Sequence, residues 1–133
     1  MPMPRVAATF VNDTYDEHGD GEFEGSALAR IDITRTFSGE IDGHSTAALM
    51  TVRSADGSAA YVAFDRVIAT IDGKSGAFVL QHWGMITADG GNIAGAIVPG
   101  SGTGDLSGIE GEGTIRVDGE GTHTLELDYR LPG

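Results

Sequence analysis

The chain has 133 residues, with 21 glycines, no cysteine and a formal net charge of −12. Its length suits one domain, and the lack of cysteine excludes disulfides and thiolate metal sites. The negative charge disfavours contact with phosphate backbones and anionic bilayers, so we expect neither nucleic acid nor membrane as a partner. No apolar run matches a signal peptide or a membrane span, which favours a cytoplasmic location.

Short apolar runs separated by glycine-bearing turns predict an all-β chain. The first strand is expected over residues 5–12, and the acidic segment 13–25 is expected to be a flexible loop. Further strands are expected over residues 26–37, 46–53, 59–72, 75–87, 93–98, 114–118 and 122–131. No segment has helical periodicity. We therefore predict that residues 1–133 form one eight-stranded antiparallel barrel, with a β-sandwich as the alternative.

Several familiar motifs are incomplete in this chain. The acidic segment has calcium-loop spacing from Asp16, but Ala27 stands at the twelfth position, where a glutamate is needed. The segment 73–75, Gly-Lys-Ser, lacks the upstream glycine of a phosphate loop, and the segment 99–113 lacks the third glycine of a dinucleotide motif. The four histidines lack paired ligand spacing. We therefore predict no metal and no cofactor.

The strands on either side of Gly73 form the most informative part of the sequence. We take Gly73 and Lys74 as the two central residues of a hairpin turn, so that residues whose numbers sum to 147 lie opposite each other. Asp65 then lies opposite His82. A carboxylate beside a histidine can orient the imidazole and support proton transfer, so these two residues are our candidate catalytic pair. The alternative is a structural ion pair at the barrel rim.

The opposite face of the same two strands is mostly apolar. In the predicted register Phe64 lies opposite Trp83. Apolar walls with a few polar groups are typical of a small-molecule pocket. The candidate substrate-binding residues are Phe64, Arg66, Gln81, Trp83 and Met85 on this face, together with Tyr61. The alternative is packing against another subunit. Because the two faces point apart, only one of them can line a cavity at this level.

The chain resembles an uncharacterised bacterial family of small proteins, known only as a domain of unknown function. The resemblance rests on SAAYVAFDRVIATIDGKSGAFVLQHWG, IVPGSGTGDLSGIEGEG and LELDYRL. By the same resemblance this family is expected to be of the allene-oxide-cyclase-like barrel type, related to allene oxide cyclases and dirigent proteins. The resemblance implies a barrel with a hydrophobic cavity in a homo-oligomer, a dimer or trimer. Its best-known relatives steer cyclisation or radical coupling of apolar substrates.

The chain departs from the usual pattern of these relatives at four positions. Asp65 stands where a glutamate is common, and Ala48 stands where an acidic residue is expected. Trp83 and Met85 stand where smaller residues are usual. The bulky pair suggests a reshaped cavity or interface, and the missing carboxylates argue against copying an acid–base mechanism directly.

These observations together predict a barrel that binds an apolar small molecule in its cavity and isomerises or cyclises it. Asp65 and His82 would then be the acid–base pair. One alternative is a non-catalytic carrier or sensor of an apolar metabolite, which needs the cavity but no acid–base group. Another is a structural oligomer whose barrel is filled by its own side chains.

Overall fold

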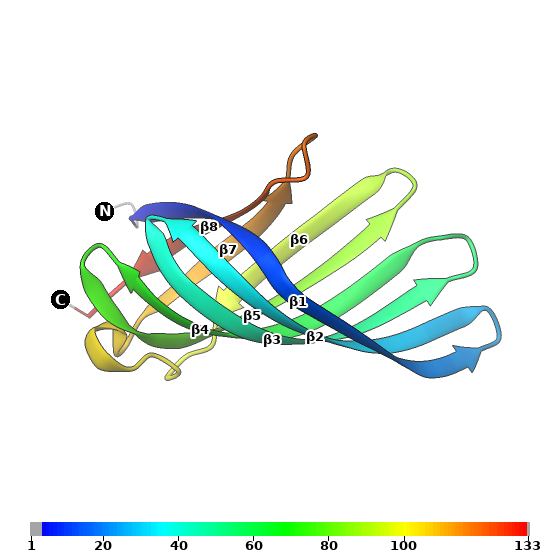
Figure 1. Ribbon diagram of the computed structural model, residues 1–133, viewed down its shortest axis with the longest axis horizontal. Coiled ribbons are helices and arrows are strands. Elements are labelled where there is room, and N and C mark those ends of the chain that lie inside the picture. Colours follow the sequence, from blue (N-terminus) through cyan, green and yellow to red (C-terminus); the bar gives the residue numbers. More distant parts are fainter. Residues whose placement is uncertain (1–3, 133) are drawn as a thin grey trace.

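The computed structural model describes residues 4–132, which form a closed, antiparallel, eight-stranded barrel, and so confirms the predicted fold class (Figure 1). Each strand pairs with its neighbours in sequence, and the last strand pairs with the first. The strands are β1 (Arg5–Phe23), β2 (Ser26–Gly39), β3 (Ile41–Ser54), β4 (Ala59–Ile71), β5 (Lys74–Thr87), β6 (Gly90–Ile97), β7 (Glu110–Val117) and β8 (His123–Arg130). A short 3-10 helix, η1 (Gly104–Leu106), lies between β6 and β7. Within the described part of the chain, no helix has the length and apolar character needed to cross a bilayer.

The acidic segment 13–25 is mostly strand, so the prediction of a loop there was wrong. β1 continues through it to Phe23 and stays paired with β2 up to the turn. Two shifts in the pairing, at Asn12/Thr14 and Gly19/Gly21, interrupt the regular alternation. The described side chains of the segment are exposed. No face of it is buried, so the sequence carries no apolar alternation that would indicate a strand.

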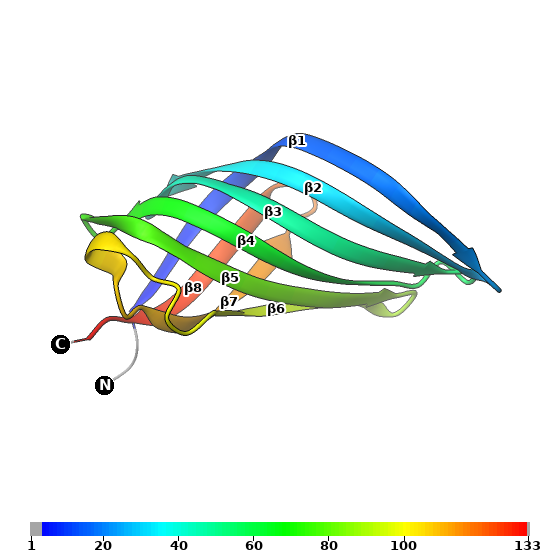
Figure 2. The same cartoon turned by 90° about the horizontal axis from the view of Figure 1, so that it is seen from below.

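The barrel is fully closed at only one of its ends. β8 pairs with β1 only over residues 5–10, and β7 pairs with β6 only over residues 112–114. Beyond these points β1 to β6 continue past the end of the β7–β8 hairpin (Figure 1). The start of β1, the end of β8 and η1 lie at the other, closed end (Figure 2). The strands that extend past the hairpin form what we call the open end.

A buried polar layer separates two apolar clusters inside the barrel. The larger cluster fills the closed end and includes Phe78 and Leu106, the last residue of η1. The smaller cluster, towards the open end, consists of Ile31, Ile33, Ala47, Leu49 and Ala63, with Tyr61 packed against it. The buried polar residues at the boundary are Arg35, Ser45, Asp65 and His82.

The turn between β4 and β5 lies one residue earlier than predicted. Ile71 pairs with Lys74, so the two central residues are Asp72 and Gly73. Their φ angles, 52° and 77°, are both positive, as a type I′ turn requires, and aspartate tolerates this conformation better than lysine. The Tyr129 hydroxyl of β8 donates a hydrogen bond to the Asp72 carboxylate, which ties the turn to the last strand.

The corrected turn moves every predicted cross-strand partner by two residues. Asp65 lies opposite Leu80 rather than His82, and Trp83 lies opposite Val62 rather than Phe64. Side chains alternate between the two faces of a strand, so a shift of two residues leaves each one on its predicted face. The shift also makes Asp65 and His82 diagonal neighbours across β4 and β5. Long side chains can still make contact over that distance.

Candidate functional site

A hydrogen-bonded network inside the barrel centres on Asp65. The Asp65 side chain is almost fully buried, as is that of His82. Its Oδ1 accepts hydrogen bonds from Arg35 Nε at 3.2 Å and from Ser45 Oγ at 2.8 Å. Its Oδ2 lies 2.5 Å from Nε2 of His82. Asp65 and His82 are therefore in contact, although they are not opposite each other in the sheet.

Strand alternation brings these side chains together from four consecutive strands. Arg35 on β2 lies directly opposite Ser45 on β3, and both point inward. On its far side Arg35 donates from a terminal nitrogen to Asn12 Oδ1 at 3.1 Å, and its guanidinium lies 5.0 Å from the ring centre of Phe10. These contacts provide partners for a guanidinium that is largely buried.

Asp65 is ionised despite its burial. Burial disfavours the charged carboxylate, but the hydrogen bonds from His82 and Ser45 and the positive charge of Arg35 outweigh it. The pKa of Asp65 consequently lies below its usual value. The layer therefore holds an ionised carboxylate paired with the Arg35 guanidinium, and hydrogen bonds orient the Asp65 carboxylate from two sides.

Tyr61 links this network to the open end of the barrel. Its hydroxyl lies 2.8 Å from Nδ1 of His82, and the two rings meet edge to face. An ionised carboxylate can only accept hydrogen bonds, so Nε2 of His82 carries a proton. In the neutral imidazole Nδ1 is then the acceptor, and the Tyr61 hydroxyl donates to it. The result is a chain of hydrogen bonds from Tyr61 through His82 to Asp65.

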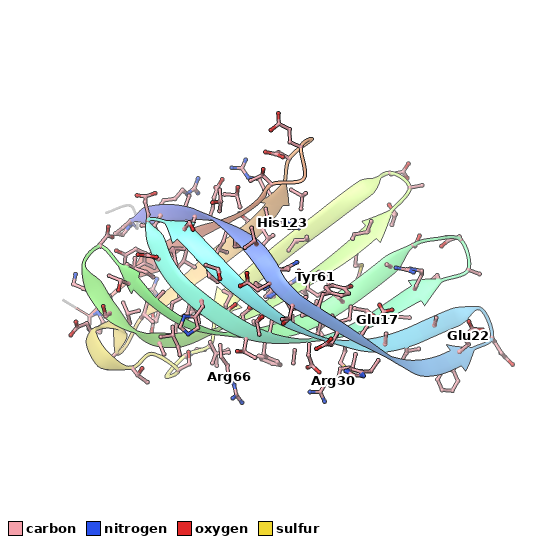
Figure 3. All side chains as sticks on the ribbon, viewed as in Figure 1. Glu17, Glu22, Arg30, Tyr61, Arg66 and His123 are labelled. Carbon is pink, nitrogen blue, oxygen red and sulfur yellow. The ribbon has the colours of Figure 1, made fainter. Side chains whose placement is uncertain are left out.

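A cavity of about 330 Å³ lies beside Tyr61, on the inner face of β1 to β5 at the open end. Its walls are mainly apolar and include Ile31, Leu49 and Ile86, and the charged residues Glu17 and Arg53 also line it. Tyr61 projects into this part of the barrel (Figure 3). Among the residues that the structure describes, no three histidine, aspartate or glutamate side chains are placed to hold a metal ion. The site therefore offers a small, mainly apolar space in which the Tyr61 hydroxyl is connected to a buried histidine.

We expect Tyr61 to make stability depend on alkaline pH. Burial raises the pKa of the Tyr61 phenol to about 12; the charge of Arg35 opposes this shift and that of Asp65 adds to it. An unfolded tyrosine titrates near pH 10, so between about pH 10 and 12 the folded state holds more protons than the unfolded state. Stability is thus retained below about pH 10 and lost as pH rises towards 12.

Urea unfolding at several alkaline pH values measures this effect. Burial also raises the pKa of Tyr129 to about 12, so this residue contributes in the same pH range. Tyr61→Phe should make the decline with pH shallower, and Tyr61→Phe combined with Tyr129→Phe should make it shallower still. Identical slopes for the wild type and Tyr61→Phe would contradict the assignment.

Comparison with known proteins now places the chain in a family. A family model described as "Protein of unknown function (DUF3224)" matches residues 6–129. The chain belongs to the DUF3224 family. It is similar to the crystal structure of a DUF3224 protein of unknown function from Shewanella oneidensis MR-1, with a TM-score of 0.84 and 29% sequence identity over 98% of each chain. No match was found among curated proteins.

The six predicted substrate-binding residues lie on two different faces of this DUF3224 barrel. Only Tyr61 points inward and lines the cavity. The other five lie on the exposed outer face of β4 and β5, and these are Phe64, Arg66, Gln81, Trp83 and Met85. Figure 3 shows Arg66 pointing away from the barrel. These five residues therefore do not line the inner cavity, because strand alternation places them on the face opposite to Tyr61 and Asp65.

Sequence reasoning missed Arg35 and Ser45, which complete the network in this DUF3224 chain. A usable signal was present for Arg35. Along β2 the inward positions Ile31, Ile33 and Phe37 are apolar, and Arg35 is the one charged residue on that face. A charge in an apolar row indicates a buried partner. Ser45 gives no such signal, since serine is common on either face of a strand.

Proposed function

We propose that the barrel binds a small, mostly apolar molecule in the cavity beside Tyr61 and moves a proton on it. The observation that carries this proposal is the hydrogen bond between Tyr61, which lines the cavity, and His82, which is held by the buried Asp65. Mainly apolar walls with a few polar groups, here Tyr61 together with Glu17 and Arg53, match the usual composition of a small-molecule site. The relationship to allene oxide cyclases suggested by the sequence is consistent with this proposal and is part of it.

In the proposed reaction Tyr61 and His82 relay one proton. The phenol is neutral at rest because its pKa is raised to about 12. When the phenol oxygen takes a proton from a carbon of the ligand, its own proton moves to Nδ1 of His82. The ionised Asp65 stabilises the imidazolium that forms, as a carboxylate does behind other catalytic histidines. Return of the proton to a different ligand atom completes an isomerisation without net gain or loss of protons or electrons.

Native mass spectrometry of the protein purified from its source tests the binding step. We expect a retained small molecule on the wild type and none on Ala29→Phe, because residue 29 lines the cavity and a phenyl ring would fill it. The matched control is Ser38→Phe, the same ring placed at an exposed position of the same strand. Equal retention by Ala29→Phe and Ser38→Phe would contradict binding in this cavity.

A second measurement separates the enzyme from a carrier. A carrier needs the cavity but no proton relay, and it would release its molecule unaltered. If the relay operates, a molecule extracted after incubation in D₂O should carry deuterium on carbon when bound to the wild type. Tyr61→Phe should bind the molecule and abolish that exchange. An unlabelled molecule on the wild type would favour the carrier.

A further inference from the structure

One outer face of the barrel is apolar over three adjacent strands. Large exposed side chains project from it, and these are Met50 on β3, Val62, Phe64 and Ile68 on β4, and Trp83 and Met85 on β5. A groove of about 400 Å³ runs between Met50, Trp83 and Met85. Outside a subunit contact, such a surface would keep a large apolar area in water. We call this surface the β3–β5 face.

The charges of the chain avoid the β3–β5 face. β3, β4 and β5 contain only two of the 20 acidic residues of the sequence, Asp42 and Asp65. Asp65 points inward, and Asp42 lies near the closed end, opposite Thr70. Arg66 is the charged residue in the middle of the face. Two copies of a chain with net charge −12 can therefore meet over these three strands without setting the exposed carboxylates of the middle of the face against each other. The nearest carboxylate on β2 is Asp32, which lies opposite Ala48 at the edge of the face.

The size of the face is close to what a stable dimer needs. Its six large side chains are each between 42% and 70% exposed, which corresponds to roughly 600 Å² of apolar surface at about 200 Å² per side chain. The largest apolar patch on a typical monomer is roughly 300–600 Å². A standard interface buries roughly 800 Å² per partner. Two smaller apolar residues enlarge the patch towards the roughly 800 Å² of a standard interface. Ala48 lies opposite Phe64, and Val79 lies opposite Arg66.

We propose that a second copy of this chain covers the β3–β5 face in a two-fold symmetric dimer. A two-fold axis presents the same patch from both subunits, so an apolar, acid-free sheet face packs against itself. Tryptophan, phenylalanine, methionine and arginine are the residue types enriched at such interfaces. A partner selected by charge would find only Arg66 to recognise in the middle of this face, which argues for self-association over a different protein.

Analytical ultracentrifugation of the full chain over a range of concentrations tests the dimer. We expect the wild type to sediment at twice the 13.8 kDa of one chain. Phe64→Glu and Met85→Glu should each raise the dissociation constant more than about a hundredfold, because two-fold symmetry sets each new carboxylate in the interface twice. Thr36→Glu, which adds the same charge at an exposed position on β2, is the matched control and should remain dimeric.

Trp83 supplies an independent readout because it is the single tryptophan of the chain. Its emission should shift to the blue as the wild type associates and should stay at the monomer wavelength in Met85→Glu at every concentration. Thermal unfolding confirms that the variants fold, since both changed side chains lie outside the core. A wild type that stays monomeric, a trimer, or an assembly that both glutamate variants leave intact would overturn the proposal.

Discussion

Replacing Asp65 with alanine is expected to lower the free energy of unfolding by about 3–5 kcal/mol. The variant leaves the buried guanidinium of Arg35 and the proton on Nε2 of His82 without their acceptor, and Ser45 loses its partner as well. Removing one member of a buried ionic network is costly because the remaining charge stays out of water. Since domains are stable by only about 5–15 kcal/mol, the loss should be evident in urea unfolding.

Two controls distinguish the network from a general effect of losing aspartate. Asp42→Ala makes the same change on the exposed face of β3 and should alter stability by less than about 0.5 kcal/mol. Asp65→Leu combined with Arg35→Met removes both charges and should recover part of the loss. Equal effects of Asp65→Ala and Asp42→Ala would contradict the buried network.

The same carboxylate also sets an acid limit for stability. Because the pKa of Asp65 is lowered in the folded state, its contribution is fully present above the unfolded value of about 3.9 and is lost as pH falls through the folded pKa. Asp65→Ala should therefore flatten the loss of stability below about pH 4.

Phe78→Ala should cost about 3–5 kcal/mol, a loss comparable to that of Asp65→Ala but with a different cause. Phe78 is 1% exposed and belongs to the apolar cluster that fills the closed end. Truncation there removes the transfer free energy of the ring and leaves a cavity that the surrounding strands cannot close. Equilibrium unfolding in urea measures the change, and the slope of the transition shows whether unfolding remains two-state.

Phe23→Ala is the matched control for this substitution. Phe23 ends β1 and is 67% exposed, so removing the same ring there should change stability by no more than about 0.5 kcal/mol. If the two phenylalanine variants unfolded at the same urea concentration, the placement of Phe78 in the core would be wrong.

The barrel and the division of residues between strand faces could be predicted from the sequence because both depend on local patterns. Glycine-bearing turns mark where strands end, and alternation fixes which residues share a face. The contact between Asp65 and His82 followed even from a wrong register, since a shift of two residues preserves the face. The error itself came from the turn, where the positive φ of Asp72 and Gly73 decides the pairing.

The sequence could not predict which face of each strand points into the barrel, because that depends on tertiary structure. On β4 and β5 both faces carry apolar residues, so periodicity does not distinguish Phe64, outside, from Phe78, inside. The position of the cavity could not be predicted from the sequence either. It exists because β1 to β5 extend beyond the β7–β8 hairpin, and that offset depends on where β8 pairs with β1.

The pairing of β8 with β1 also bears on how the chain folds as it leaves the ribosome. Domains form from the N-terminus during synthesis, and β1 to β5 already contain Asn12, Arg35, Asp65 and His82. Their sheet, however, keeps two free edges until the last strand arrives, and Tyr129 reaches Asp72 only at that stage. The nascent sheet must therefore hold its polar layer in contact with water until β8 pairs with β1 and closes the barrel.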